Sequence, residues 1–468
     1  MRLGRGRWWV AAALLVVLGA GGTAAVLLRG TALPGTAASP RSRVGPPPDP
    51  VRGPLLGRLA LGAPDPSAAA LLRALAPALR DPRLGTRLAV SVVDATTGSP
   101  LYEQGAFAGV VPASTTKIAT AVAALVTLPH DRRLRTRVLA GPGPGDIVLV
   151  GGGDPTLAGK YPVSSYPRPA RLLDLARGVH AALGAHPVRR VLVDDQLYAG
   201  PRLGPGWKPT YVTFGDVAPV SALEVDEGRT TPGDHVPRVP DAALEAGRQL
   251  AALLGGPAGG AVSSIAVLHG AARAGARELA HADGPTTSQL VEGMLTRSDN
   301  DLAEALGRQV ALAKGQPATF EGEAASLRVV LGDVLDGLHQ SRDAVRLVDA
   351  SGLSPRDRVE PGALTRVLTL VARDPRFGPV LSGLPVAGFD GTLAQRYRHG
   401  PAAAAAGAVR AKTGTLSGVS ALAGLVRTHD GRLLAFDLTA YGVQGEAVER
   451  SQRALDRVAA VLARCGCG

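Results

Sequence analysis

The sequence has very little cysteine, asparagine and lysine, and the shortage of cysteine excludes two common kinds of site. Only two cysteines occur among 468 residues, Cys465 and Cys467, both within the last four positions. Two thiols cannot complete a four-ligand zinc site, and thiols this close together cannot cross-link a long loop. We therefore expect no metal, no disulfide framework and a short tail at 465–468.

Aromatic residues are also scarce, at 3% of the chain, so leucine, valine and alanine must fill its cores. The formal net charge of +12 could indicate a nucleic-acid partner. However, only five of the 51 basic residues are lysine, and the arginines are scattered along the chain without interleaved aromatics. A basic arm or a stacking platform for single strands would gather such residues together. We expect no nucleic-acid partner.

The N-terminal region has the pattern of a targeting segment. Three arginines within the first seven residues precede 21 uncharged residues at 8–28. That length can cross the hydrocarbon core as a helix, and the positive-inside rule places the rest of the chain outside the cytoplasm. We predict a signal peptide or signal anchor at 1–29, then a Pro/Gly-rich linker at 30–56. The protein would be extracytoplasmic, in the cell wall or periplasmic space, and either membrane-anchored or secreted.

Beyond the linker, short apolar runs bounded by turn residues indicate strands, and longer apolar periods indicate helices. The expected strands are 88–93, 101–104, 146–150, 190–194, 408–413, 419–427 and 432–441. The expected helical regions are 115–128, 170–183, 241–254, 286–314 and 446–464. Because the pattern changes between 139 and 284, we predict an inserted domain there, which divides a second domain into 57–138 and 285–464.

Three short motifs follow one another along the chain: Ser114-Thr115-Thr116-Lys117, Ser298-Asp299-Asn300 and Lys412-Thr413-Gly414. Taken singly, each has an ordinary explanation, such as a helix cap, a solvated charge or a turn residue. Asn300, however, is the only asparagine in the chain, and two of the five lysines lie in the other two motifs. Asparagine and lysine are thus rare in the chain but present in the three motifs that a single catalytic mechanism would use.

The spacing of the first motif predicts a nucleophile and its base. Ser114 and Lys117 would lie on one face of the first helical turn, where the lysine can accept the hydroxyl proton. To do so near neutral pH, Lys117 needs a pKa roughly three units below its usual value of about 10.4. Burial and a neighbouring cation would lower it, and Lys412 is the candidate cation. The backbone amides of Ser114 and Thr415 would form an oxyanion hole.

The other two motifs supply the remaining groups that cleavage of a peptide bond requires. Ser298 can relay a proton to the leaving amine, Asn300 can hold the substrate backbone, and Lys412 can bind a terminal carboxylate together with threonine hydroxyls. The candidate catalytic residues are Ser114, Lys117, Ser298, Asn300 and Lys412. The candidate substrate-binding residues are Thr413, Gly414, Thr415 and Ser417.

With these motifs, residues 88–441 resemble the DD-peptidase and serine β-lactamase superfamily. The similarity is to the D-alanyl-D-alanine carboxypeptidase/endopeptidase group, the low-molecular-mass class C penicillin-binding proteins. It extends to the segments GGDPTL at 152–157, DASGLS at 349–354 and FDGTL at 389–393. After Ser354 the group usually has Arg and then Asn, whereas this chain reads Pro355-Arg356-Asp357. The segment between Tyr198 and Ala242 is short, which indicates that one inserted lobe is reduced.

The resemblance implies an α+β fold, in which an antiparallel sheet packed by helices is interrupted by an inserted domain between the first two motifs. It implies a serine D-alanyl-D-alanine carboxypeptidase, with or without endopeptidase activity, that works through an acyl-enzyme on Ser114. The implied partners are peptidoglycan stem peptides ending in D-Ala-D-Ala, β-lactams as covalent inhibitors, and the membrane through the N-terminal segment. No cofactor is implied.

Two alternatives stay open at this point. A serine β-lactamase shares the acylation groups, but the class A pattern needs a Glu just before an Asn, and the sole Asn already belongs to Ser298-Asp299-Asn300. A non-catalytic cell-wall-binding scaffold could keep the same fold, although all the catalytic side chains are present. A hydrolase of the Ser-His-Asp type fits less well, because the sequence has no GxSxG nucleophile elbow.

Overall fold

The computed structural model describes residues 67–161, 166–255 and 265–466. The expected targeting segment at 1–29 and linker at 30–56 lie outside these ranges. Within the ranges, no helix is both long and apolar enough to span a bilayer. The described residues form two five-stranded sheets, one two-stranded sheet and eleven α-helices.

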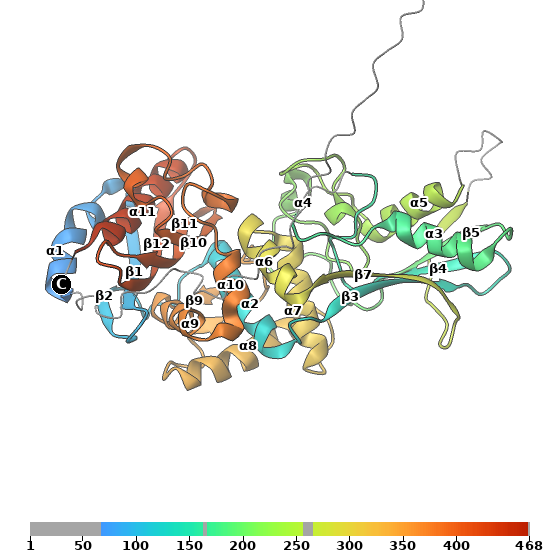
Figure 1. Ribbon diagram of the computed structural model, residues 1–468, viewed down its shortest axis with the longest axis horizontal. Helices are drawn as coiled ribbons and strands as arrows, with labels where there is room; N and C mark the ends of the chain where they lie inside the picture. The colour runs from blue at the N-terminus through green and yellow to red at the C-terminus, as the bar shows by residue number, and fades with distance from the viewer. Residues whose placement is uncertain (1–66, 162–165, 256–264, 467–468) are drawn as a thin grey trace, which may run out of the picture. The chain divides into compact units, whose positions relative to one another are not determined.

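The first sheet is antiparallel, with strand order β10-β11-β12-β1-β2. Its strands are β1 (Arg87–Asp94), β2 (Pro100–Gln104), β10 (Val409–Leu416), β11 (Gly418–Arg427) and β12 (Leu433–Val443). Helices α1 (Ala68–Leu79) and α11 (Ala447–Arg464) lie on one face, and α9 (Pro361–Arg373) lies on the other (Figure 1). Neighbouring residues of β11 enter different cores, Leu422 beside α11 and Ala423 beside α9. Burial of both faces explains why most residues of this strand are apolar.

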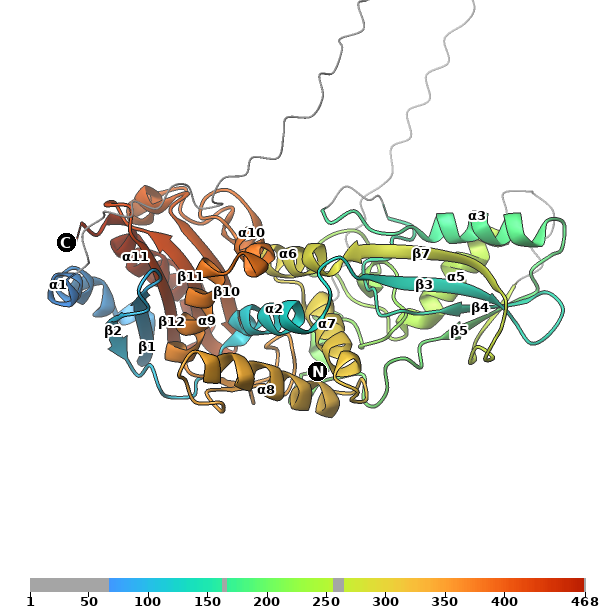
Figure 2. The ribbon, with the colours of Figure 1, turned by 60° about the horizontal axis from the view of Figure 1, so that its bottom comes forward.

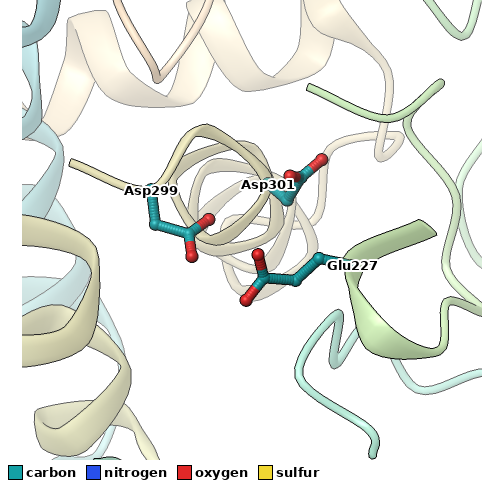
Figure 3. Close-up of side chains that lie close together, drawn as sticks. All are labelled: Glu227, Asp299 and Asp301. Atoms are coloured by element: carbon teal, nitrogen blue, oxygen red, sulfur yellow. The ribbon is translucent and has the colours of Figure 1, made fainter. Parts of the chain in front are cut away.

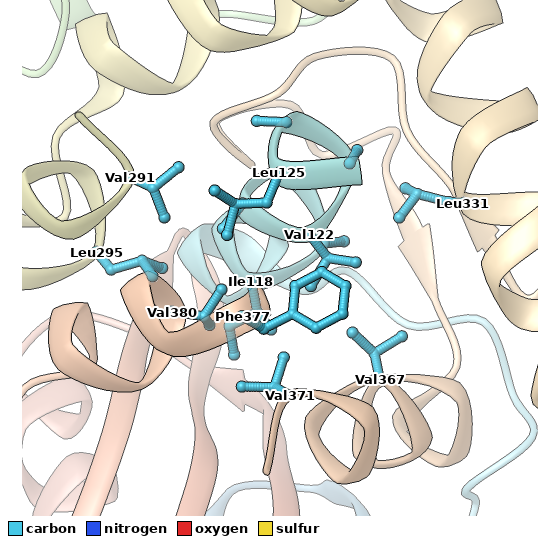
Figure 4. Packing of buried hydrophobic residues seen from close by; sticks show 14 of the residues in the cluster. Ile118, Val122, Leu125, Val291, Leu295, Leu331, Val367, Val371, Phe377 and Val380 are labelled. Atoms are coloured by element: carbon cyan, nitrogen blue, oxygen red, sulfur yellow. The ribbon is translucent and has the colours of Figure 1, made fainter. Parts of the chain in front are cut away.

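Helix α2 (Thr116–Thr127) follows the SxxK serine and is almost entirely buried. Its neighbours are α6 (Thr287–Arg297), α7 (Asn300–Ala313), α8 (Phe320–Gly337), α9 and α10 (Gly378–Gly383). Figure 4 shows Ile118, Val122 and Leu125 of α2 surrounded by side chains of these elements and by Phe377. A helix that is apolar on all sides belongs in a protein interior. Lys117, in the first turn of α2, and Ser114, just before this helix, are therefore held by a tightly packed element.

The second sheet is mixed, with strand order β6-β5-β4-β3-β7. Its strands are β3 (Arg133–Ala140), β4 (Asp146–Val150), β5 (Arg190–Asp194), β6 (Ala266–His269) and β7 (Glu278–Thr286). Helices α3 (Leu172–Leu183) and α5 (Ala242–Gly255) pack on it around a core of its own (Figure 2). It begins before the expected start of the insertion at 139, because β3 pairs with β7 from Arg133 onward. The remaining elements are α4 (Thr210–Phe214), β8 (Val345–Arg346) and β9 (Arg358–Val359).

The expected strands and helices correspond to elements of the fold, with one informative difference. The helical region expected at 286–314 is divided at Ser298 and Asp299. Ser298 ends α6 with a left-handed φ of 61°, and the Asp299 side chain accepts a hydrogen bond from the Leu302 amide at the start of α7. Such an aspartate cap favours a new helix start. The break presents the SxN motif at the junction of two helices.

Candidate active site

Ser114 lies in a short 3-10 helix, Ala113–Thr115, that leads into α2. The opposite loop approaches so closely that a Cβ on Gly352 would lie 2.0 Å from the Ala113 carbonyl oxygen. Gly352 also has a φ of 80°, a conformation that glycine adopts without strain. The Ser114 side chain does not cap α2, because its hydroxyl oxygen lies 3.0 Å from Nζ of Lys117. The serine is therefore placed for chemistry with the lysine.

Lys117 Nζ has three partners, and their chemistry fits a neutral amine. The Asn300 Oδ1 atom and the Ser351 carbonyl oxygen each lie 2.6 Å away. Both are acceptors, since the Asn300 Nδ2 group donates to the Asp216 carbonyl at 2.7 Å. They therefore take two N–H groups of the amine. Nζ also lies within hydrogen-bond distance of Ser114 Oγ, so when the amine loses a proton its lone pair can face this hydroxyl, which is what a general base needs.

Burial lowers the pKa of Lys117 to about 8, although the carboxylates of Asp349 and Glu304 act in the opposite direction. Sequence reasoning named both burial and the cation of Lys412; burial is the cause that lowers the pKa of Lys117, and the charge effect between the two lysines acts on Lys412. Lys412 is fully buried as well, and burial, followed by the nearby Lys117, holds the pKa of Lys412 well below its usual value. Two ammonium groups in one buried site disfavour each other. A neutral lysine is therefore accessible near neutral pH.

The SxN motif connects the two lysines. Lys412 Nζ donates to Ser298 Oγ at 2.7 Å, and Lys117 Nζ donates to Asn300 Oδ1 at the other end of the motif. Because Ser298 ends one helix and Asn300 begins the next, their side chains can reach different partners. The motif thus joins residues that are far apart in sequence, with 183 positions separating Lys117 from Asn300.

Strand β10 is the edge of the first sheet, and part of its outer edge is covered. Residues 385–387 pair with it as far as Ala411, whose amide donates to the Pro385 carbonyl at 2.9 Å. The KTG motif lies immediately beyond this covered stretch. A Cβ on Gly414 would lie only 2.8 Å from the Pro112 carbonyl oxygen, so glycine lets β10 lie against the turn that carries Ser114.

The remaining substrate-binding candidates have separate partners. Thr413 Oγ1 lies 3.0 Å from Thr392 Oγ1, in the segment FDGTL. Thr415 and Ser417 are exposed; the Thr415 hydroxyl accepts from a glutamine of α11 at 3.0 Å, and the Ser417 hydroxyl accepts from Lys208 Nζ at 2.7 Å. The structure therefore gathers one connected set, consisting of Ser114, Lys117, Ser298, Asn300 and Lys412, with Thr413 beside it. The two lysines of this set are fully buried.

Sequence reasoning missed several groups that support this set. Glu304 Oε1 accepts the amides of Ala350 and Ser351 at 3.2 and 2.9 Å and so fixes the carbonyl that binds Lys117. Trp207, from the inserted segment, donates its indole N–H to Asp349 Oδ2 at 2.7 Å. A main-chain carbonyl leaves no signal in a sequence. Trp207 does leave one, because it is the only tryptophan after the N-terminal segment.

Comparison with known proteins agrees with this geometry. The family described as D-Ala-D-Ala carboxypeptidase 3 (S13) matches residues 71–235 and 232–462. Carboxypeptidase DacB of Mycolicibacterium smegmatis is 40% identical over 415 residues, which cover 87% of each chain. Carboxypeptidase Rv3627c of Mycobacterium tuberculosis is 38% identical over 418 residues, which cover 86% of this chain and 85% of that one. The chain belongs to the D-Ala-D-Ala carboxypeptidase 3 (S13) family.

The protein is a serine-type D-Ala-D-Ala carboxypeptidase, as the sequence analysis predicted. Among solved structures, penicillin-binding protein 4 (dacB) from Haemophilus influenzae matches with a TM-score of 0.63 and covers 83% of this chain and 97% of that one. At 20% identity this likeness is one of fold. It confirms the expected α+β class with a serine β-lactamase/DD-peptidase-like domain.

A cavity of this carboxypeptidase extends from Ser298 and Thr392 toward the inserted residues. Three carboxylates lie together beside it, with oxygens within 4.8 Å of one another: Glu227, Asp299 and Asp301 (Figure 3). Each forms an ion pair with an arginine: Glu227 with Arg229, Asp299 with Arg297 and Asp301 with Arg238. The guanidinium groups supply the positive charge that a metal ion would otherwise supply. We assign an ion-pair network here and no metal site.

Proposed function

We propose that Ser114 is the nucleophile of this D-Ala-D-Ala carboxypeptidase and that Lys117 is its general base. The observation that carries the proposal is the surroundings of Lys117 Nζ, where two acceptors use two N–H groups and Ser114 Oγ lies 3.0 Å away. Lys117 takes the hydroxyl proton while Oγ bonds to the carbonyl carbon of the penultimate D-Ala. The C–N bond then breaks, and water later cleaves the ester and restores Ser114.

The leaving amine of the terminal D-Ala receives its proton through Ser298, to which Lys412 donates at 2.7 Å. We assign the terminal carboxylate to Lys412 with Thr413 and Thr415. A bound carboxylate favours the charged form of Lys412, against the burial that lowers its pKa, and the two hydroxyls can donate to it. Asn300 holds Lys117 and the substrate backbone. Gly414 and Ser417 belong to the same strand, along which the substrate peptide would lie.

The proposed substrates are peptidoglycan stem peptides that end in D-Ala-D-Ala, so we place the enzyme outside the cytoplasm. The three arginines and 21 uncharged residues at the N-terminus support a signal peptide or a signal anchor that attaches the enzyme to the membrane. β-Lactams should form a covalent adduct on Ser114. Penicillin-binding protein 4 from Haemophilus influenzae has been solved in complex with a novel β-lactam.

Cleavage of cross-links is a second activity that one observation favours. An endopeptidase must accommodate a leaving group larger than D-Ala, which needs room beyond the serine that protonates the amine. The cavity beside Ser298 and Thr392 offers such room, and it is lined by charged groups that include Arg297 and Asp216. Release of the shorter product from a cross-linked dimer of stem peptides would reveal this activity.

Intact-mass analysis after incubation with penicillin tests the proposal. The full chain should gain the mass of one penicilloyl group, and peptide mapping should place that group on Ser114. Ser114→Ala should gain nothing, and Lys117→Arg, which keeps the charge but cannot lose its proton, should acylate roughly 100- to 10,000-fold more slowly. An adduct on Ser114→Ala, or an arginine variant that reacts at the wild-type rate, would contradict the assigned roles.

A further inference from the structure

Two buried carboxyl groups meet behind the loop that contacts Lys117. Asp349 and Asp357 are both fully buried, and each holds main-chain amides of this loop. Asp349 accepts the amides of Gly352 and Ser354 at 2.8 and 2.7 Å, and Asp357 Oδ1 accepts the Val348 amide at 2.8 Å. The two side chains therefore clamp residues 348–354, the loop whose Ser351 carbonyl binds the base.

The two groups lack the cations that would allow both to ionise. Within the described ranges, no lysine or arginine forms an ion pair with either of them. Arg358, the nearest in sequence, donates instead to the main-chain carbonyls of Pro355 and Asp357. Asp357 Oδ2 is buried and has no hydrogen-bond partner among the other described residues unless it carries a proton. Two adjacent buried carboxylates would repel strongly, whereas one shared proton gives a hydrogen bond.

We propose that Asp357 is a positioning residue that stays protonated, donates a hydrogen bond to Asp349, and thereby fixes the Ser351 carbonyl against the catalytic base. Asp349 is the acceptor of the pair because its oxygens already receive two amides and the Trp207 indole N–H. Those three donors already use its oxygens as acceptors, so the shared proton belongs on Asp357. The inference rests on the proposed role of Lys117.

The electrostatic surroundings agree with the geometry. Burial, followed by the neighbouring Asp349, raises the pKa of Asp357 well above its usual value. Other ionisable groups that face the pair are Glu304 and Glu323, which disfavour a second negative charge, and Tyr211 and Lys117. At neutral pH Asp357 keeps its proton. Above its raised pKa a second negative charge would appear behind the loop and loosen it.

Infrared difference spectroscopy tests the protonation directly. The wild-type spectrum minus that of Asp357→Asn at neutral pH should show the carbonyl band of a protonated carboxylic acid, which the amide lacks. A carboxylate band in the difference spectrum instead would mean that Asp357 is ionised and would overturn the proposal. A purely structural effect of the substitution cannot produce the acid band.

The acylation rate tests the positioning. Asp357→Asn keeps a donor toward Asp349 and an acceptor for the Val348 amide, so its penicillin acylation rate should stay within about tenfold of wild type. Asp357→Ala removes both and should react roughly 100-fold more slowly, as expected for a misplaced catalytic group. Asp437→Asn is the matched control, since Asp437 is buried too and accepts a hydrogen bond from Thr439 within β12, away from the loop at 348–354.

The outcomes separate this inference from the proposed function. If Asp357→Ala acylates at the wild-type rate, or if Asp357→Asn is as slow as Asp357→Ala, the positioning role is wrong even though Ser114 still carries the adduct. If the wild-type enzyme forms no adduct on Ser114, the proposed function itself fails. Circular dichroism of both variants shows whether a slow rate reflects a misplaced base or an unfolded chain.

Discussion

The pH dependence of acylation is the sharpest consequence of the buried base. Only the neutral form of Lys117 can take the Ser114 proton, and burial lowers the pKa of Lys117 to about 8. The reactive fraction therefore grows as the pH rises toward and through that value. A solvated lysine would stay charged over this whole range, because its pKa is about 10.4.

The size of the effect follows from the titration of one group. With a pKa of about 8 for Lys117, the neutral fraction is about 1% at pH 6, about 9% at pH 7 and about 50% at pH 8. The second-order rate constant for acylation should therefore rise about tenfold from pH 6 to 7 and about fivefold from pH 7 to 8. Above pH 9 Lys117 is almost fully neutral, so its titration should change the rate constant little.

Rapid-mixing measurements with a fluorescent penicillin would give this rate constant at each pH. Lys117→Arg should lose the rise, because arginine stays protonated throughout. Lys160→Arg is the matched control, since Lys160 is an exposed lysine paired with Glu245 and should leave the profile unchanged. A wild-type rate that is flat between pH 6 and 8, or that rises only near pH 10, would refute the buried neutral lysine.

The remaining predictions concern the site proposed for the substrate's terminal carboxylate and a buried ion pair in the protein interior. A stem peptide with an amidated C-terminus should release its terminal residue roughly 10- to 100-fold more slowly than the free acid, since a hydrogen bond to a charged group contributes about 1.5–3 kcal/mol. Lys412→Ala should reduce D-alanine release even more. If the wild-type enzyme turned over the amidated peptide and the free acid equally fast, the assignment of the terminal carboxylate to Lys412 would be wrong. Arg308→Met should destabilise the fold by about 3–5 kcal/mol in urea titrations, because it breaks a buried ion pair with Glu323. Arg328→Met, which breaks an exposed pair, should change little.

The sequence alone predicted much of the local structure. The strands at 146–150 and 190–194 are found where they were expected, because alternating or continuous apolar runs report burial within a few neighbouring residues. Helix α2 was expected for the same reason. The family and the activity followed from three motifs whose residue types are rare in this chain, and the comparisons confirmed both.

Other features depended on contacts between distant segments. Strand β3 and helices α8 and α9 were not expected, because their burial is decided by partners such as β7 and α2 that lie elsewhere in the chain. The break between α6 and α7 is another such case: an apolar period continues through 286–314, and only the capping contact of Asp299 and the backbone of Ser298 end one helix and begin the next.

The sequence by itself identified the candidate catalytic groups. Side-chain chemistry is local, and asparagine and lysine are so rare in this chain that Asn300 and the lysines of the motifs stand out. The tertiary structure decided how those groups behave. The lowered pKa of Lys117 comes from burial, and one of its partners is the Ser351 main-chain carbonyl, which any residue could have supplied. Burial, main-chain contacts and shared protons belong to the packed fold as a whole, so no single stretch of the sequence records them.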